Sequence, residues 1–300
     1  MLDKTFLINK IITTLQKNEF EVFLTHGCFD IAAKREFLML IKTLINIDGM
    51  NEDQALSLRA ISHFVSAYPF VISLKNNRSF LNDNTVYSRF DLPVLTPKLF
   101  ENIIVDEDMS AIKSAKGRHT AEINSSVLKE KRRELDYTLE ELAKIIGISK
   151  KALYEIENNR VSPKNETAKK LENILGVHLR VPYEMRTSQA IYLKPKDEFQ
   201  GKVSKELDRI GVDNSSVYSV PFQIIGKGKF SLITSLSKNI SEVKREAVIV
   251  KRLSGILSSK VMFVAKKSGE KLIDGVPIIP ESKLLEMSSS KELNEILEGS

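Results

Sequence analysis

The stretch TLEELAKIIGISKKALYEIEN, residues 138–158, predicts two short helices joined by a tight turn. Thr138 offers an N-cap hydroxyl, and Glu141 three residues later completes a capping box, so a helix begins directly after Thr138. Gly147 supplies the positive φ that a helix end needs, and Ser149 caps a second helix that runs to the end of the stretch. Because two helices joined by so short a turn must cross steeply, the sequence predicts a helix-turn-helix.

The segments on either side predict further helices of the same small domain. Residues 128–135, LKEKRREL, carry leucines one heptad apart. Downstream, a helix opens after Pro163 and stops at Gly176. Its predicted buried stripe consists of Ala168, Leu171, Ile174 and Leu175. We therefore expect an all-α helix-turn-helix domain over residues 124–182.

Residues 124–180 resemble the lambda-repressor-like (Cro-type) helix-turn-helix domain. In that family the second helix of the motif enters the major groove of DNA. The resemblance implies that Lys150, Lys151 and Glu155 face base edges, with Tyr154 beside them. The whole implied DNA interface, whose last three members would face phosphates, is Ser149, Lys150, Lys151, Tyr154, Glu155, Asn158, Arg160 and Lys164.

The same resemblance implies a structural ion pair and shows one departure from the family. Arg132 and Glu157 occupy the positions at which family members pair an arginine of the first helix with a glutamate that closes the recognition helix. The family usually has a phosphate-contacting glutamine as the first residue of the earlier helix, where this chain has Leu139. We therefore expect a weaker or shifted backbone contact there.

The charge of this domain favours DNA by its position more than by its amount. Residues 124–180 hold twelve Lys and Arg against nine Asp and Glu, a net charge of +3. The lysines and arginine of the implied interface cluster on its groove-facing side, whereas Glu130, Glu134 and Glu172 lie elsewhere. The alternative is a small helical domain that contacts other proteins.

The whole chain has the composition of a globular protein. Its 300 residues are 42% hydrophobic and 28% charged, with a net charge of +6, and allow two or three domains. No signal-peptide pattern or membrane-spanning run is present, so we expect a cytoplasmic protein without a membrane partner. Cys28 is the single cysteine and there are four histidines. We therefore expect no disulfide, no zinc site and no cofactor.

Residues 1–105 predict a mixed α/β unit, and the order of its elements recurs in residues 187–288. Each region reads as a helix, three strands, a helix, two strands and a helix. In the second region we expect one of these strands at residues 217–222. Residues 106–123 are rich in charged and small side chains and predict a solvated linker; the alternative is a basic arm that enters the minor groove. Residues 289–300 predict a polar tail with at most one loose helix.

Fixed landmarks indicate that the two α/β regions are one structural unit used twice. Phe29 and Phe37 are eight residues apart, as are Phe222 and Phe230. Each region also ends in an X-Pro strand that is followed by a proline and a helix. The alternative is that two α/β domains share an element order by chance.

The element order of the first region resembles the core of PD-(D/E)XK nucleases. In that family an aspartate ends one strand and an acid-x-lysine triplet lies on the next, so that two carboxylates hold the divalent cation that activates water. The resemblance places Asp30 and Lys42 at two of these positions, but Leu40 stands where the second acid belongs. Leucine cannot coordinate a metal.

The nuclease-like set is therefore incomplete in both regions. Three acidic residues could replace the missing ligand, namely Glu19, Glu21 and Glu36. In the second region Gln223 and Ser235 stand at the positions that match Asp30 and Lys42. We expect no catalytic residues and no metal site, and hence no enzyme.

The whole layout resembles the archaeal HTH-type transcriptional regulatory proteins, which carry a repressor-type helix-turn-helix between α/β regions. This implies a sequence-specific regulator of transcription that binds double-stranded DNA, with no effector identified. One reading head contacts few base pairs, so we expect a homodimer with heads about 34 Å apart and an interface supplied by the α/β regions. The alternative function is a metal-dependent nuclease or DNA-repair factor that the helix-turn-helix delivers to DNA.

Overall fold

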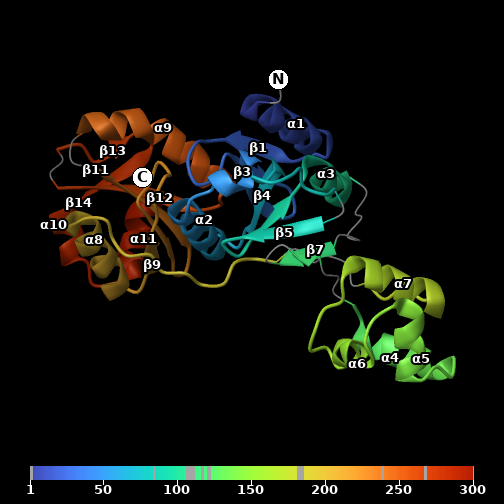
Figure 1. Ribbon diagram of the computed structural model, residues 1–300. Coiled ribbons are helices and arrows are strands. Elements are labelled where there is room, and N and C mark those ends of the chain that lie inside the picture. Colours follow the sequence, from blue (N-terminus) through green and yellow to red (C-terminus); the bar gives the residue numbers. More distant parts are fainter. Residues whose placement is uncertain are drawn as a thin grey trace. The chain divides into compact units, whose positions relative to one another are not determined.

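A computed structural model of the protein describes residues 3–83, 85–105, 112–115, 118–119, 123–180, 186–237, 240–266 and 269–299 (Figure 1). The chain divides into two compact units. The first unit combines Met1–Asn77 with Arg186–Ser300, and the second unit is Arg78–Met185. Mixed α/β regions precede and follow a helical domain in the chain, which confirms the predicted fold class.

The N-terminal half of the first unit, residues 3–77, contains four strands and two α-helices. Its elements are α1 (Lys4–Lys17), β1 (Glu21–Leu24), β2 (Ile31–Lys34), β3 (Leu38–Asn46), η1 (Ile47–Gly49), α2 (Glu52–Phe64) and β4 (Tyr68–Lys75). The strand order is β1-β2-β3-β4, antiparallel as far as β3 and parallel between β3 and β4. The first six residues of β3 are buried, because this central strand is covered on both faces.

The C-terminal half of the first unit, residues 186–299, repeats this order of elements. Its elements are α8 (Glu198–Arg209), β9 (Asp213–Ser216), β10 (Ile224–Lys227), β11 (Ser231–Ser237), α9 (Ile240–Ile256), β12 (Lys260–Ala265), β13 (Leu272–Ile273), β14 (Val276–Pro280), α10 (Glu281–Glu286) and α11 (Ser290–Glu298). The sheet order is β13-β14-β12-β11-β10-β9. As in the N-terminal half, an antiparallel meander is followed by a parallel neighbour.

Two segments of the C-terminal half differ from the sequence-based expectation. Residues 217–222 form a loop after β9, and the prediction of a strand there is wrong. Ser219 turns the chain with a φ of 55°, and Pro221 has no amide hydrogen for a ladder. Residues 289–300, expected as a polar tail with at most one loose helix, contain α11, which is not loose because Leu293 is fully buried in the core of this half.

The strand registers match the two halves residue by residue. Lys34 lies opposite the first residue of β1, and Lys227 lies opposite the first residue of β9, so these two lysines correspond. Tyr68 lies opposite Met39 in the N-terminal half, and Lys260 lies opposite Leu232 in the other. This register agrees with the phenylalanine spacing and supports a duplicated unit.

The two halves pack through reciprocal contacts, as the subunits of a two-fold dimer do. Helix α2 contacts β9 and β10, and the matching helix α9 contacts β1 and β2. Lys34 donates a hydrogen bond to Ser258, and the matching Lys227 donates one to Ser66 over 3.3 Å. Both serines follow the matching helices and both adopt positive φ, 54° at Ser66 and 51° at Ser258. One chain therefore contains a pseudo-two-fold pair of α/β units.

Gly27 lies where the backbone of the N-terminal half contacts that of the C-terminal half at Ser219. Its φ is 132°, and a Cβ atom added to it would lie 1.7 Å from the carbonyl oxygen of Ser219. The amide of Cys28 donates to the same oxygen over 2.6 Å. Glycine is therefore required here both by the backbone conformation and by the lack of space.

The second unit begins with strands that resemble the end of the C-terminal half. Its elements before the helical domain are β5 (Thr85–Arg89), β6 (Leu92–Leu95), α3 (Pro97–Val105), β7 (Ile112–Ala115) and β8 (Arg118–His119). β5 and β6 pair antiparallel, as β13 and β14 do, with Pro93 and Pro277 at matching places. β7 and β8 fall within residues 106–123, which we expected as a linker, and β7 pairs with β5.

Four short helices complete the second unit: α4 (Ser125–Glu134), α5 (Leu139–Ile146), α6 (Lys150–Glu157) and α7 (Asn165–Leu175). They share one apolar core that includes Leu128, Leu142, Leu153 and Leu171, each fully buried. The two ends of the domain meet, since the amide of Asn124 donates to the carbonyl of Leu179 over 2.8 Å. Within the described ranges, none of the protein's helices is long and apolar enough to span a membrane.

Candidate nucleic-acid interface

Local capping fixes α5 and α6 at the positions that the sequence predicts. Thr138 and Glu141 form the capping box at the start of α5. Gly147 ends α5 with a φ of 82°, in the left-handed region. The hydroxyl of Ser149 accepts a hydrogen bond from the Ala152 amide over 3.1 Å and starts α6. Each signal acts over three residues or fewer, and together they set the short turn of the motif.

Helix α6 divides its side chains between the domain core and solvent. Leu153 and Ile156 are buried. The exposed residues of α6 are Lys150, Lys151 and Tyr154. Two lysines in the first turn oppose the helix dipole, which is unfavourable by about 0.3–1 kcal/mol for each exposed charge. Helix stability therefore does not explain their presence.

The polar side chains of this face make few and exposed contacts. Lys150 Nζ lies 3.2 Å from Glu140 Oε2 at the start of α5, and both side chains are exposed. Arg160 Nη1 lies 3.4 Å from Glu155 Oε1, and the Arg160 guanidinium lies over the Tyr154 ring at 5.7 Å. Such exposed pairs contribute about 0–1 kcal/mol, so a polyanion can displace them at small cost. Glu140 was not predicted from the sequence. It lies on α5, ten residues before Lys150, and the two side chains meet only because the turn brings α5 and α6 together.

The remaining residues of the predicted interface lie at the end of α6 and beyond it. Asn158 is the C-cap residue of α6, and its side-chain amide donates to the Tyr154 carbonyl over 2.8 Å. Lys164 is exposed at the N-cap of α7. In the parts of the chain that the structure describes, Lys151 and Lys164 have no ion-pair partner. Their ammonium groups are therefore available to an anion.

A buried ion pair holds α6 against α4. Arg132 Nε donates to Glu157 Oε1 over 2.6 Å, and Nη2 donates to Oε2 over 3.1 Å. Arg132 Nη1 also donates to the carbonyl of Tyr137 over 2.7 Å, which ties the α4–α5 turn to the same pair. The side chains are 10% and 2% exposed. A two-pronged buried pair fixes orientation as well as distance.

The start of α5 lacks a polar side chain at the position where the resembling family has glutamine. Leu139 is packed against the domain core. Its side chain cannot donate to a phosphate oxygen, so only the backbone amides of this helix end remain for such a contact.

Asp30 lies in a polar cluster whose donors occupy both of its carboxylate oxygens. Oδ1 accepts from Lys4 Nζ over 2.8 Å and from Lys42 Nζ over 3.3 Å. Oδ2 accepts from the Thr43 amide over 2.8 Å and from its hydroxyl over 3.0 Å. Burial alone would raise the pKa of Asp30, but the Lys4 and Thr43 hydrogen bonds and the lysine charges lower it below its ordinary value. Sequence reasoning found Asp30 and Lys42 but missed Lys4 and Thr43.

These residues do not fit the divalent cation of the nuclease family. The lone pairs that would bind a metal are already paired with protein donors, and Lys42 also donates to the Gly27 carbonyl over 2.5 Å. Leu40 is fully buried. Across the described residues, no group of three or more His, Cys, Asp or Glu side chains could hold a metal ion. The Asp30 cluster therefore does not offer the ligands that a metal-dependent cleavage reaction requires.

The three acids considered as substitutes lie at the wrong end of the strands. Glu21 is opposite Lys34, at the end of β2 remote from Asp30. Glu36 is in the β2–β3 turn at that same remote end, and Glu19 precedes β1. Strands rise about 3.4 Å per residue, and Lys34 is four residues from Asp30, so the backbone at Glu21 is roughly 14 Å along the strands from the cluster. None of the three can supply the second ligand.

The matching site in the C-terminal half has two neutral side chains, Gln223 and Ser235, where the N-terminal half has Asp30 and Lys42. Gln223 Oε1 accepts from the Leu236 amide over 2.6 Å, just as Asp30 accepts from the Thr43 amide. Ser235 stands in place of Lys42. Cys28, beside the Asp30 cluster, is fully buried, and burial raises the pKa of its thiol, so it stays protonated and is no nucleophile.

The geometry of the second unit defines a helix-turn-helix domain, and comparison with known families agrees. The helix-turn-helix family profile matches residues 128–181, and that of the PD-(D/E)XK superfamily domain matches residues 4–110. The chain is thus a helix-turn-helix protein that also carries a nuclease-related α/β domain.

Similarity to curated proteins extends over nearly the whole chain. A protein of Pyrococcus abyssi named "Putative HTH-type transcriptional regulatory protein" is 30% identical over 280 residues, which cover 90% of this chain and 89% of the relative. Proteins of the same name from Methanothermobacter thermautotrophicus and Archaeoglobus fulgidus are 29% and 26% identical, over 99% and 97% of this chain and 96% of each relative. The chain belongs to this family of HTH-type transcriptional regulatory proteins. No solved structure is a match.

Proposed function

We propose that this protein is a sequence-specific transcription regulator that reads duplex DNA with the exposed face of α6. The observation that carries the proposal is the pair of lysines in the first turn of α6, an energetically unfavourable place for cations unless they meet an anion. Lys150 and Lys151 would lie at base edges with Glu155 and Tyr154. Arg160 and Lys164, past the end of α6, would bind phosphates.

The test begins with selection of a preferred duplex from a random pool, followed by polarisation titrations of the full chain. Replacing Lys150→Ala together with Lys151→Ala removes two groups at base edges. We expect binding to the selected duplex to weaken by roughly 2–6 kcal/mol and the base preference to relax, since each base contact is worth about 1–3 kcal/mol. Lys131→Ala together with Lys169→Ala is the control, because it removes the same charge from α4 and α7.

Arg160→Ala separates backbone contact from base reading. We expect it to weaken binding to every duplex alike and to reduce the salt slope by about one unit, as the loss of one phosphate contact does. The proposal would be contradicted if the unmodified chain bound the selected and random duplexes with equal affinity. This contradiction would also require that neither Lys150→Ala with Lys151→Ala nor Arg160→Ala changed that affinity.

We propose further that the protein acts as a homodimer on a near-palindromic site, because one head contacts too few base pairs for useful specificity. The faces of α2 and α9 that pack between the halves are occupied within one chain, so the dimer must use other surfaces. Analytical ultracentrifugation with and without the selected duplex tests this. A single chain on each duplex at saturation would contradict it.

We propose that the α/β regions have no nuclease activity. The Asp30 cluster supports this, because both carboxylate oxygens are bonded to protein donors. Supercoiled plasmid should remain uncut by the full chain in Mg²⁺ and in Mn²⁺. Cleavage that Asp30→Asn abolishes would reverse the assignment.

A further inference from the structure

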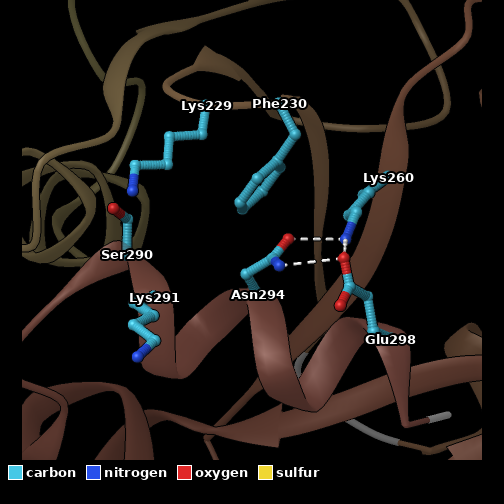
Figure 2. Close-up of a pocket in the computed structure, with 7 residues that line it drawn as sticks. All are labelled: Lys229, Phe230, Lys260, Ser290, Lys291, Asn294 and Glu298. Carbon is cyan, nitrogen blue, oxygen red and sulfur yellow. Dashed lines mark hydrogen bonds and ion pairs between the residues drawn. The ribbon is translucent and has the colours of Figure 1, made fainter.

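We propose that the first unit binds a nucleoside phosphate in a hollow between the β10–β11 turn, β12 and α11 (Figure 2). The hollow has a volume of about 300 Å³, which is within the lower range of small-ligand sites. Its lining residues are Lys229, Phe230, Lys260, Ser290, Lys291, Asn294 and Glu298. This proposal is independent of the function proposed for α6.

The matching place in the N-terminal half is filled by aromatic side chains. There Phe37 packs edge-to-face against Phe20 and Tyr68, each at 5.6 Å between ring centroids. In the C-terminal half Phe230 keeps the position of Phe37, but Val212 and Lys260 occupy the places of Phe20 and Tyr68 by strand register. The ring of Phe230 has thus lost its two stacking neighbours and is only partly buried.

Helix α11, which has no counterpart in the N-terminal half, supplies the facing wall of the hollow. Lys260 Nζ donates to Asn294 Oδ1 over 2.5 Å and to Glu298 Oε1 over 2.9 Å, and Asn294 Nδ2 donates to the same Glu298 oxygen over 2.9 Å. Lys260 Nζ also lies 5.0 Å from the centroid of the Phe230 ring. This linked network fixes one side of the hollow, beside the ring (Figure 2).

The other side of the hollow is cationic and free to bind an anion. Lys229 extends towards Ser290, and the flexible side chain of Lys291, the next residue of α11, begins beside Ser290 and points away from Lys229 (Figure 2). Among the described residues Lys229 has no ion-pair partner, and Lys291 has only a 4.0 Å contact with Glu295. The lining carries three lysines against one glutamate, so its net charge is +2.

A nucleoside phosphate combines the two chemistries that this hollow offers. Every nucleobase has a flat π face that can stack on an aromatic side chain such as Phe230. A phosphate group would accept hydrogen bonds from Lys229, Lys291 and the Ser290 hydroxyl. The Asn294 amide and Glu298 carboxylate lie where a base edge could be read. A simple anion would use only the lysines and leave the ring unexplained.

The experiment is calorimetric titration of the full chain with AMP, ATP, adenosine, inorganic phosphate and a short single-stranded oligonucleotide. We expect saturable binding of the nucleotides, at least tenfold tighter than that of adenosine or phosphate alone. Phe230→Leu keeps the apolar volume but removes the π face, and should weaken nucleotide binding about tenfold. Lys229→Met with Lys291→Met changes only exposed side chains and should weaken it by a similar factor.

Two control variants show whether a loss of nucleotide binding is specific to the hollow. One lies in the other half, and the other lies in α6. Lys17→Met in α1 changes one exposed charge in the other half and should leave nucleotide binding intact. Lys150→Ala with Lys151→Ala should also leave nucleotide binding intact. The proposal of a nucleotide site and the proposal of DNA reading by α6 can therefore fail independently. Binding of the oligonucleotide alone, sensitive to Phe230→Leu, would identify a strand end as the source of the nucleoside phosphate. No saturable binding of either, or binding unaffected by both changes in the hollow, overturns the proposal.

Discussion

The two halves of the first unit share one fold but differ in the side chains at two matching places. The N-terminal half buries Asp30 with Lys42 and adds an ion pair to the partly exposed Lys4, whereas the C-terminal half forms the matching backbone hydrogen bond with the neutral Gln223. The N-terminal half packs Phe37 between two rings, whereas the C-terminal half leaves Phe230 beside a cationic hollow. The feature that both halves share is therefore the hydrogen bond from a central-strand amide to the side chain of Asp30 or Gln223, whereas the charges of Asp30 and Lys42 belong to the N-terminal half alone.

The contacts of Asp30 give its carboxylate a structural role in the N-terminal half. In the N-terminal half the carboxylate binds two lysines and both donors of Thr43, so it stabilises the strand ends instead of a cation. Removing one member of such a buried set leaves an uncompensated charge. Its partners therefore depend on one another. In the C-terminal half, Gln223 and Ser235 carry no charge of their own, and the Ser235 hydroxyl donates to Glu246 Oε2 over 3.4 Å.

The largest expected effect comes from Asp30→Asn, which leaves Lys42 buried without its counter-charge. We expect a loss of about 3–5 kcal/mol in the stability of this half. Lys42→Met should cost a similar amount, but the double variant should cost much less than their sum, because the pair fails as a unit. Hydrogen exchange of β2 and β3 amides in the full chain measures this. Simple additivity of the two changes would contradict the paired account.

Gly27→Ala should break the packing between the halves. The new Cβ would clash with the Ser219 carbonyl, and the φ of 132° disfavours any side chain, so we expect a loss of about 3 kcal/mol or more. The matched control is Gly255→Ala in α9, where nothing lies within 4 Å of the new atom. That change should stabilise the helix by up to about 1 kcal/mol. Equal thermal unfolding of the two variants would contradict this view of the junction.

Acid should destabilise the N-terminal half through Asp30. The folded-state pKa of Asp30 lies below its ordinary value of 3.8, because its hydrogen bonds and the nearby lysines outweigh burial. The contribution of the carboxylate is therefore fully present above that ordinary value and is lost as pH falls through the folded-state pKa. Urea unfolding at pH 5 and pH 3 should show a larger loss in the unmodified chain than in Asp30→Asn. An equal loss in both would exclude Asp30 as the source.

The smallest effects should come from the reciprocal lysine–serine hydrogen bonds. Lys34→Met and Lys227→Met each remove one exposed hydrogen bond between the halves, and we expect each to cost about 0.5–1 kcal/mol. The two changes should cost similar amounts, because the bonds are related by the pseudo-two-fold axis. Chemical denaturation of both variants measures this. A cost confined to one of them would show that the halves do not contribute equally.

The sequence predicted what depends on neighbours in the chain. The capping box at Thr138 and the positive φ at Gly147 act within three residues, so the boundaries of α5 and α6 followed directly. The duplication followed from the spacing of phenylalanines. Strands β5, β7, β8, β9 and β13 were not predicted, because they are short or polar and depend on partner strands.

What the sequence could not predict depends on packing between distant segments. Lys4 reaches Asp30 from α1, 26 residues away, and no local pattern indicates which helix end meets which strand end. The reciprocal contacts of α2 and α9 likewise require both halves to be folded. The hollow beside Phe230 is lined by residues of the β10–β11 turn, β12 and α11, which only folding brings together.

We propose that α6 reads DNA sequence and that the α/β regions do not cleave DNA. One titration tests both parts: the full chain is added to its selected duplex in Mg²⁺, and retardation and strand breakage are followed together against a random duplex. We expect saturable retardation of the selected duplex at concentrations that leave the random duplex free, with both strands intact. Equal retardation of the two duplexes, or breakage that Asp30→Asn abolishes, would contradict the account.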